Sequence, residues 1–297
     1  MPIIQVDNVS MRFNLAQEKT ETLKEYTVKL LKHQLFFNEF YALQDVSFSI
    51  EPGESVALIG RNGSGKSTML KVISGVMYPS GGSVAVNGEI APMIELGAGF
   101  DMDLTARENI FLNGAVLGHD RDYMMEHFDR IIEFSELKDF VDVPVKNFSS
   151  GMIARLGFSI ATEVQADILV CDEVLAVGDF MFQQKCHRRM EEMLSNGTTL
   201  LFVSHDRYFL DNVCTKIWEV SFQTMTTYKG NFSAYLPQKE AADALRQKQH
   251  DADVALAEKL QDYIDRNLVR ASTTKMAQSR RKQLEKLEIA EAPTAEA

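Results

Sequence analysis

The chain has 297 residues, and its 31 Lys and Arg against 42 Asp and Glu give a formal net charge of −11, which argues against a protein that coats nucleic acid. Its three scattered cysteines (Cys171, Cys186 and Cys214) exclude a disulfide framework or a cysteine zinc site and fit a reducing cytosol. The first residues lack the basic and apolar regions of a signal peptide, and no run of about 18 apolar residues occurs, so we expect no secretion signal and no membrane span.

Short apolar runs alternate with helical patterns through the first two thirds of the chain. Alternation or apolar runs predict strands, whereas apolar spacing of three and four predicts helices. The strands are expected at 3–9, 46–50, 55–59, 168–171 and 199–203, with a hairpin around an Asn87-Gly88 turn, and the helices at 18–35, from about 66, at 121–140 and at 153–163. Strands that alternate with helices predict an α/β domain with a largely parallel central sheet.

The composition changes at Pro237. Glycine is absent from there on, while Ala, Gln, Lys, Glu and Leu dominate to about residue 290. This pattern predicts two helices, about 238–267 and 273–287, that form a helical hairpin. We therefore expect an α/β domain over 1–236, a helical, coiled-coil-like arm over 237–290 and a disordered tail over 291–297.

A glycine-rich loop follows the predicted strand at 55–59. Residues 60–68 (Gly-Arg-Asn-Gly-Ser-Gly-Lys-Ser-Thr) match the phosphate-loop pattern G-x-x-x-x-G-K-[ST] in full. The glycines let backbone N–H groups turn inward around nucleotide phosphates, while Lys66 supplies a positive charge and Ser67 offers a hydroxyl to Mg²⁺. The candidate nucleotide-binding residues here are Gly60, Asn62, Gly63, Ser64, Gly65, Lys66, Ser67 and Thr68.

The predicted strand at 168–171 ends in two carboxylates, Asp172 and Glu173. Asp172 can hold Mg²⁺ through a water molecule, and Glu173 can polarise the water that attacks the terminal phosphate of ATP. Many strands end in acidic residues for no catalytic reason. The phosphate loop upstream is what makes this pair a candidate for ATP hydrolysis.

The order of these and later motifs resembles that of the ABC ATPases. Phe-Ser-Ser-Gly-Met at 148–152 stands where the family has its L-S-G-G-Q signature, Asp179 ends a D-loop-like Ala-Val-Gly-Asp, and His205 stands at the switch histidine. The resemblance implies a P-loop NTPase fold with a parallel core sheet, an antiparallel β subdomain and a helical subdomain over about 95–165. It also implies an ATP-dependent homodimer, in which Ser149, Ser150 and Gly151 of each chain face the γ-phosphate held by the other chain.

Two departures from the family pattern concern the signature and the Q-loop. The signature lacks its second glycine and its glutamine, and no glutamine occurs between Gly88 and Asn109, so Glu95 is the Q-loop candidate. In this family an aromatic residue after the first strand stacks on adenine, which points to Phe13, with Phe37 and Tyr41 as alternatives. Ordinary core packing would explain each of these aromatic residues equally well.

The motifs of residues 1–203 resemble those of the ATPase subunits that export O-antigen, capsule and teichoic acid. The likeness rests on Glu-Leu-Gly-Ala-Gly-Phe at 95–100, the signature region, Asp-Glu-Val-Leu-Ala-Val-Gly-Asp at 172–179 and a helical insertion at about 14–40. It implies a separate integral-membrane permease as partner. A cytoplasmic chain, peripheral on the inner face of the cell membrane, is then expected.

The later motifs differ: Ser-His-Asp-Arg-Tyr-Phe-Leu-Asp-Asn-Val-Cys at 204–214, Thr-Tyr-Lys-Gly-Asn-Phe-Ser-Ala-Tyr-Leu at 227–236 and the basic helical stretch at 275–288. Through them, residues 204–291 resemble the end of the first cassette and the interdomain linker of ABC-F proteins, many of which act on the ribosome. The chain is thus expected to be a hybrid, joined near His205. Between Arg266 and Lys286 stand seven basic residues and one acidic residue, a cluster that could meet RNA phosphates or form a solvated helix face. Three functions remain: an exporter ATPase, which the cassette motifs favour, a translation-associated ATPase, and a hybrid that binds ATP without coupling it to work.

Overall fold

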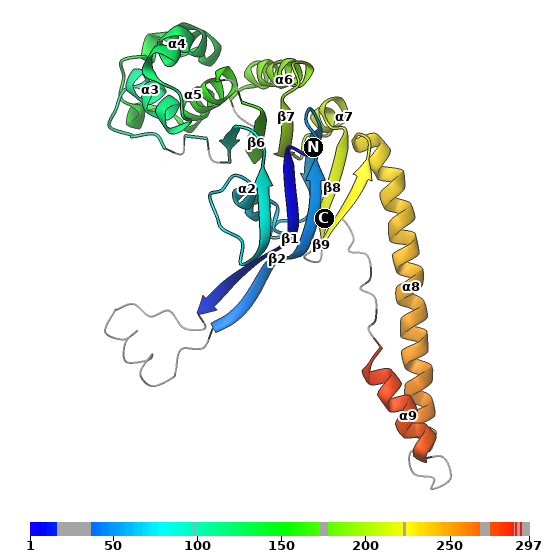
Figure 1. Cartoon of the computed structure of the whole chain (residues 1–297). Helices are drawn as coiled ribbons and strands as arrows, with labels where there is room; N and C mark the ends of the chain where they lie inside the picture. Colours follow the sequence, from blue (N-terminus) through cyan, green and yellow to red (C-terminus); the bar gives the residue numbers. More distant parts are fainter. Residues whose placement is uncertain are drawn as a thin grey trace, which may run out of the picture. The chain divides into compact units, whose positions relative to one another are not determined.

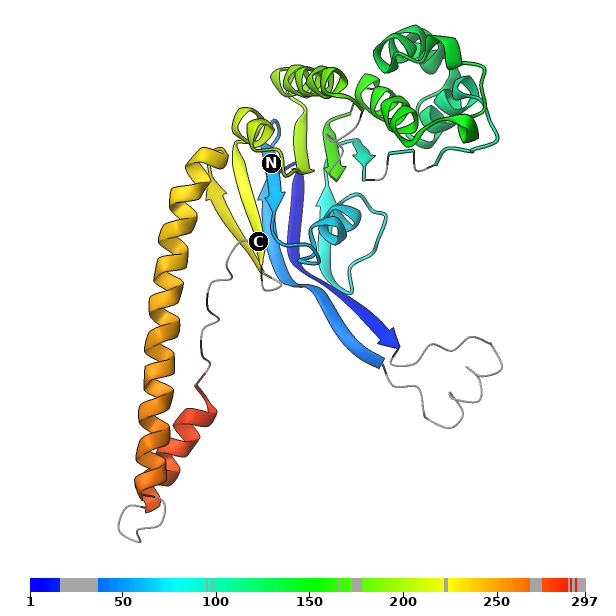
Figure 2. The ribbon, with the colours of Figure 1, turned by 180° about the vertical axis from the view of Figure 1, so that it is seen from behind.

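The computed structural model describes residues 1–16, 37–94, 96–97, 99–164, 166–172, 178–221, 224–267, 274–287, 289 and 292. Its contacts divide the chain into two compact units, Met1–Phe232 and Ser233–Ala297. The first unit combines two sheets with a group of helices, and the second consists of helices (Figures 1 and 2).

A six-stranded sheet forms the centre of the first unit, with strand order β5-β6-β7-β3-β8-β9. The first five strands run parallel, and β9 is antiparallel to β8. The bounds are β3 Ser55–Ile59, β5 Ile90–Met93, β6 Ile168–Asp172, β7 Thr199–Val203, β8 Lys216–Ser221 and β9 Thr224–Lys229. Strands β3, β6 and β7 are buried along almost their whole length, as the continuous apolar runs predict for a parallel sheet covered on both faces.

A second, antiparallel sheet has the order β2-β1-β4, with β1 over Ile4–Ala16, β2 over Phe37–Ile50 and β4 over Gly81–Val86. The β1–β2 ladder continues to the pair Ala16↔Phe37. The expectation of a helical insertion from about 14 to 40 is therefore wrong at residues 14–16 and 37–40, where backbone pairing in the ladder extends both strands. The stretch 18–35, where a helix is expected, falls within residues 17–36, which lie outside the described part of the chain.

The hairpin expected around Asn87-Gly88 is also wrong. Strand β4 pairs with β1, whereas β5 pairs with β6 in the other sheet. The backbone N–H of Glu89 donates to Asp167 Oδ2 at 2.9 Å, and a Cβ on Gly88 would lie 2.9 Å from Asp167 Cβ. Gly88 thus lets the chain cross from one sheet to the other close to the start of β6.

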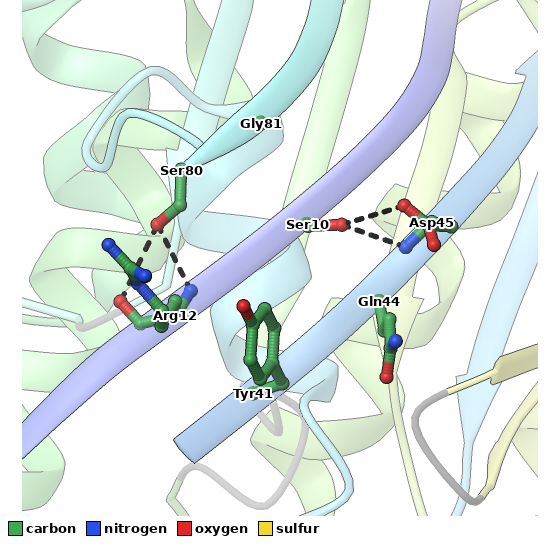
Figure 3. Close-up of a pocket in the computed structure, with 7 residues that line it drawn as sticks. All are labelled: Ser10, Arg12, Tyr41, Gln44, Asp45, Ser80 and Gly81. Carbon is green, nitrogen blue, oxygen red and sulfur yellow. Dashed lines mark hydrogen bonds between the residues drawn. The ribbon is translucent and has the colours of Figure 1, made fainter. Parts of the chain in front are cut away.

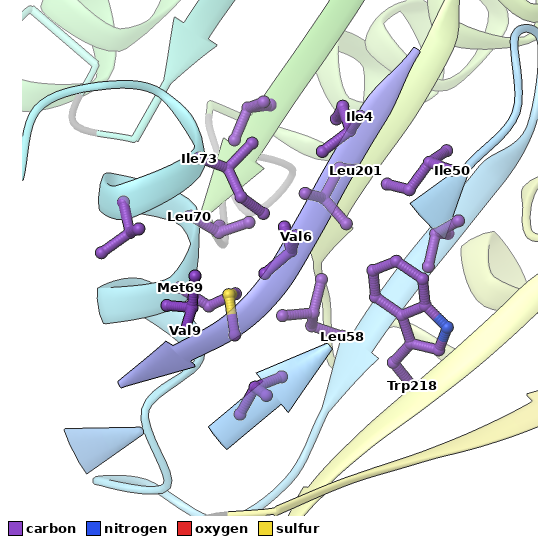
Figure 4. Close-up of a cluster of buried hydrophobic side chains, with 14 of the residues drawn as sticks. Ile4, Val6, Val9, Ile50, Leu58, Met69, Leu70, Ile73, Leu201 and Trp218 are labelled. Carbon is purple, nitrogen blue, oxygen red and sulfur yellow. The ribbon is translucent and has the colours of Figure 1, made fainter. Parts of the chain in front are cut away.

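One hydrophobic core joins the two sheets to helix α2, Lys66–Ile73 (Figure 4). It takes Ile4, Val6 and Val9 from β1, Leu58 from β3, Leu201 from β7 and Trp218 from β8, and Met69, Leu70 and Ile73 from α2. The phosphate loop, which connects β3 to α2, is thereby anchored at both ends in a close-packed interior.

The helices α3, α4 and α5 have a core of their own and gather beside the sheets (Figure 1). They span Ala106–Val116, Arg121–Ser135 and Ser150–Glu163, with short 3₁₀ turns η1 at Lys138–Phe140 and η2 at Val145–Asn147. Thr105 and Glu108 form a capping box that begins α3. Helices α6, Phe180–Ser195, and α7, Arg207–Val213, complete the first unit, and the predicted α/β class with its antiparallel and helical subdomains is confirmed.

The second unit is built from α8, Phe232–Asn267, and α9, Thr274–Glu285. Both views show α9 turning back along the end of α8, as expected of a helical hairpin (Figures 1 and 2). Helix α8 begins at Phe232, five residues before Pro237, so this proline stands in the second turn of the helix, where its missing N–H removes one intrahelical hydrogen bond.

Candidate active site

The parallel strands bring the predicted nucleotide-binding motifs to one edge of the central sheet. Leu58 of β3 pairs with Val203 of β7, and Val203 pairs with Asp172 of β6, so the three strands end at the same level. The phosphate loop follows β3, Asp172 ends β6, and His205 follows β7. This carboxyl edge of a parallel sheet is where α/β proteins bind their ligands.

The phosphate loop adopts backbone conformations that only glycine accepts readily. Gly60, Gly63 and Gly65 have φ angles of 144°, 82° and 105°. A Cβ on Gly60 would collide with the carbonyl oxygen of Val220, and a Cβ on Gly65 would lie 2.6 Å from the carbonyl oxygen of Ala42. Both conformation and space therefore require glycine at positions 60 and 65.

Lys66 lies inside this loop. Its Nζ donates to the carbonyl oxygens of Gly60, at 2.7 Å, and Arg61, at 3.1 Å, and the residue is only 6% exposed. A buried ammonium needs compensating partners, which the curled backbone supplies here. The positive charge is thus held at the N-terminal end of α2, where the backbone N–H groups of the first turn also favour a phosphate.

The remaining loop side chains differ in exposure. Ser67 is exposed and Thr68 half-buried in the first turn of α2, while Ser64 Oγ is buried and has no hydrogen-bond partner among the residues that the structure describes. Hydroxyl and carboxylate oxygens are the donors that Mg²⁺ prefers, so Ser67 and Asp172 suit this ion chemically. No group of three or more His, Cys, Asp or Glu residues with metal-site geometry occurs in the described part of the chain.

At the end of β6, Asp172 is partly exposed and follows the buried Cys171. Burial raises the pKa of the Cys171 thiol, so this cysteine is an uncharged core residue. Glu173 lies in residues 173–177, outside the described part of the chain. Its predicted role as the residue that polarises water stays a prediction.

His205 is exposed directly beyond β7. The next residue, Asp206, caps α7 by accepting hydrogen bonds from the N–H groups of Tyr208, at 2.9 Å, and Phe209, at 3.2 Å. Asp206 N–H in turn donates to Ser204 Oγ at 3.1 Å. This network fixes the turn that carries His205 at the carboxyl edge of the sheet.

The three aromatic candidates for adenine stacking lie on β1 and β2. Phe13 is partly buried and packs against the core that contains α2. Tyr41 lines a polar cavity of about 340 Å³ with Ser10, Arg12 and Ser80 (Figure 3). Phe37 begins β2. The structure describes the surroundings of two of these aromatic residues. Phe13 contacts the core shared with α2, whereas Tyr41 lines a separate polar cavity.

The signature residues stand at the start of α5. Ser149 caps this helix by accepting a hydrogen bond from the N–H of Met152 at 3.3 Å, and both Ser149 and Ser150 are exposed. Gly151 lies in the first turn, where a Cβ would meet only Ser149 Oγ at 3.9 Å. An exposed helix start with two serines offers N–H and O–H donors to an anion from another chain. The Q-loop candidate Glu95 lies outside the described residues.

Asp179 caps α6 in the same way, accepting from the N–H of Phe182 at 3.0 Å. This hydrogen bond and the neighbouring Arg155 lower the pKa of the Asp179 carboxyl, which is therefore charged. Arg155 is joined to Asp179 by an ion pair of 2.6 Å. Sequence patterns gave no sign of this pair, because its members stand on different helices.

Comparisons with known proteins identify the family of this chain. Two family models, both described as ABC transporter, match residues 43–176 and 218–297. The O-antigen export system ATP-binding protein RfbB of Klebsiella pneumoniae is 44% identical over 218 residues, which cover 73% of this chain and 89% of that protein. The teichoic acids export ATP-binding protein TagH of Staphylococcus haemolyticus is 38% identical over 237 residues, 80% of this chain and 88% of that protein.

Solved structures show the same fold. An ATP-binding subunit of an ABC transporter superposes with a TM-score of 0.64 at 22% identity, over 80% of this chain and 93% of that one. The dimeric cassette MJ0796 bound to ADP and phosphate gives 0.61 at 20% identity, over 76% and 98%. The matches to RfbB and TagH show that the chain belongs to the ABC transporter family, as an ATP-binding cassette of the ABC ATPase class.

The relatives and structures described above lend no support to the ABC-F resemblance of residues 204–291. Those relatives are named as export or transporter proteins. Among the helices in the described part of the chain, none is both long and apolar enough to cross a membrane.

Proposed function

We propose that this chain is the ATP-hydrolysing subunit of an exporter that moves a polysaccharide or lipid-linked glycan through a separate membrane permease. The observation that carries the proposal is the 44% identity to an O-antigen export ATP-binding protein over most of both chains. The phosphate loop closed around Lys66 supports ATP as the energy source.

The proposed roles follow the order of the sequence motifs, and the places of Lys66, Asp172 and His205 near the carboxyl ends of β3, β6 and β7 support them. Lys66 and the N–H groups of the loop hold the β- and γ-phosphates, and Phe13 stacks on adenine. Ser67 would hold Mg²⁺ directly and Asp172 would hold it through water, and the ion would neutralise charge on the phosphates. Glu173 accepts a proton from the attacking water, and His205 contacts the γ-phosphate. Glu95 is proposed to sense the nucleotide at the Q-loop position.

We propose that the working form is a homodimer with two ATP sites. Each chain contains one phosphate loop and one signature, and the signature serines Ser149 and Ser150 are exposed rather than turned toward their own chain's core. In a head-to-tail dimer they would meet the phosphates bound by the other copy, beside its Asp179. Docking on its permease would hold the dimer at the inner face of the cell membrane.

Contact with RNA through residues 266–286 is not part of the proposal. Arg266 pairs with Asp262 at 2.8 Å and Arg281 with Glu285 at 3.2 Å, both one helical turn away, and Arg280 donates to Gln283 at 2.9 Å. Such pairs are typical of a solvated helix surface.

Deletion of the gene in its source organism tests the proposal. We expect surface polysaccharide to fall and its lipid-linked precursor to accumulate inside the cell, with rescue by the wild-type gene but not by Lys66→Ala. Unchanged surface polysaccharide in the deletion strain would show that the exporter assignment is wrong.

A further inference from the structure

One side chain of the signature helix joins three helices of the first unit. Arg155 of α5 donates from Nη2 to Asp179 Oδ2, at 2.6 Å, and from Nη1 to Glu136 Oε2, at 2.8 Å. Its guanidinium carbon lies 4.6 Å from the centroid of the Phe182 ring on α6. Arg155 therefore touches the residue that ends α4, the cap of α6 and the first turn of α6.

A lysine of α6 closes the same network. Lys185 Nζ donates to Glu136 Oε1 at 3.2 Å and to the carbonyl oxygen of Phe134 at 2.8 Å. Glu136 itself has a left-handed backbone, with φ of 61°, at the C-terminal end of α4. We call Arg155, Glu136, Asp179 and Lys185 the Arg155 network. It fixes the ends of α4 and α6 to the middle of α5.

Gly178, directly before Asp179, lies close to Arg155. A Cβ on Gly178 would lie 3.2 Å from Arg155 Nε and 3.3 Å from Phe182 Cβ, and Gly178 has a φ of 76°. A side chain at position 178 would displace either the loop or the guanidinium. The position of Asp179 is thus set by its contact with Arg155 as well as by its own helix.

The network contributes little to stability. The Arg155 side chain is 17% exposed, but those of Glu136 and Asp179 are 51% and 65% exposed, and ion pairs with exposed carboxylates stabilise proteins weakly. A second ion pair between the same two helices, Arg189 Nη2 to Glu163 Oε2 at 2.6 Å, involves a carboxylate that is only 5% exposed. The pair at Glu163 is therefore the one expected to stabilise the packing of α5 on α6. The presence of the pair at Asp179 needs an explanation other than stability.

We propose that Arg155 is a positioning residue for ATP hydrolysis. It stands six residues after Ser149 on the helix that presents the signature serines, and it holds the D-loop residue Asp179 at a fixed place relative to them. This inference rests on the proposed function, because each element serves an ATP site in the dimer. Arg155 makes the signature and the D-loop of one chain move together, and it does not itself touch ATP.

The first test measures steady-state ATP hydrolysis by the full chain and its Arg155→Gln variant. Because a misplacement of about 1 Å can cost about 100-fold in rate, we expect kcat to fall about 10- to 100-fold. KM for ATP should change less than about twofold, because the phosphate loop is untouched. The matched control is Arg189→Gln, which breaks the other α5–α6 ion pair and should lower the melting temperature while leaving kcat near that of the wild type.

A double-mutant cycle with Asp179→Asn identifies the pair. Asparagine still caps a helix but loses the charge that pairs with Arg155. Asp179→Asn alone should reproduce the loss in kcat, and the double variant should lose little more. Arg155→Lys, which keeps the charge but lacks the planar fork of N–H donors, should recover only part of the rate.

Several results would overturn the inference. One is an unchanged kcat in Arg155→Gln. Another is an equal loss of kcat in Arg155→Gln and Arg189→Gln that follows the fall in their melting temperatures. The third is a loss of kcat in the double variant that equals the sum of the two single losses in free energy. If Arg155→Gln does not fold, Asp179→Asn decides alone, and a normal kcat in that variant rejects the role of the pair. A wild-type chain that neither binds nor hydrolyses ATP would instead reject the proposed function, and this inference with it.

Discussion

The backbones of Gly97 and Gly157 approach so closely that a Cβ on Gly157 would lie 3.1 Å from the nitrogen of Gly97. Gly157 stands in the middle of α5, and Gly97 belongs to the loop after β5 that also carries Glu95. A Cβ on Gly97 would in turn lie 2.5 Å from Ile153 Cγ2 on the same helix. The segment after β5 therefore packs directly on the signature helix α5, so a displacement of either one requires the other to move.

Substitution of Gly157 should separate these two segments. Gly157→Val places three additional carbons in a filled contact, and overpacking of this kind costs about 1–3 kcal/mol in the free energy of unfolding. Urea unfolding measured by the fluorescence of Trp218, the single tryptophan and a buried core residue, checks the value.

The matched control is Gly151→Ala on the same helix, where a Cβ meets nothing closer than 3.9 Å. Alanine favours a helix over glycine, so the control should not lose stability. Equal stabilities for wild type and Gly157→Val would mean that the loop moves aside freely.

Removal of the Lys66 ammonium should prevent productive ATP binding. Lys66→Ala deletes a buried charge held by the carbonyl oxygens of Gly60 and Arg61 and leaves the phosphates without their counter-charge. We expect affinity for ATP to fall at least about 100-fold, close to 3 kcal/mol. Equilibrium binding of a fluorescent ATP analogue measures it, with Lys71→Ala on the same helix as the control of equal charge change. Equal affinities in the two variants would contradict the assignment.

Sequence patterns predicted the phosphate loop well because its chemistry is local. Glycine at 60 and 65, a lysine and the helix start all lie within nine residues, so one short motif specifies the whole cradle. The buried strands were equally predictable from the sequence, since β6 and β7 are almost continuous apolar runs. Strand β6 ends at Asp172, and β7 ends two residues before His205. The carboxyl-edge arrangement then follows from their parallel order.

Features that depend on distant partners could not be predicted in this way. Asn87-Gly88 has the composition of a hairpin turn, but the hydrogen bond from Glu89 to Asp167 directs the chain into another sheet. The long β1–β2 ladder beyond Phe13 shows no clear alternation and is held by cross-strand pairing. The Arg155–Asp179 ion pair depends on how α5 packs against α6, which no spacing in the sequence encodes.

Acidification should weaken the fold through His187. Burial lowers the pKa of this imidazole below its usual range, although Asp206, 3.8 Å from Nε2, and Glu191 oppose the shift. The unfolded chain takes up the proton near pH 6.5 and the folded chain only at lower pH, so stability is complete above about 6.5 and falls below it.

His187→Gln removes this proton uptake. The stability of the wild type should decrease by at most about 1.4 kcal/mol per pH unit more steeply than that of the variant just below pH 6.5. Urea unfolding at pH 7.5, 6.5 and 5.5 compares the two slopes. Parallel slopes would show that His187 takes up its proton equally in both states.

Glu173→Gln separates ATP binding from hydrolysis. The amide preserves the size of the side chain but cannot accept the proton of the attacking water, so we expect hydrolysis to slow about 100-fold or more while ATP still binds. With MgATP the variant should then accumulate as a dimer, because the nucleotide that joins the two copies is no longer consumed. Light scattering after size-exclusion chromatography, with and without MgATP, measures this shift. Asp172→Asn is the informative control, since loss of the carboxylate proposed to hold Mg²⁺ should raise the Mg²⁺ concentration that hydrolysis requires rather than trap a dimer. A wild-type rate of hydrolysis in Glu173→Gln would show that another group activates the water.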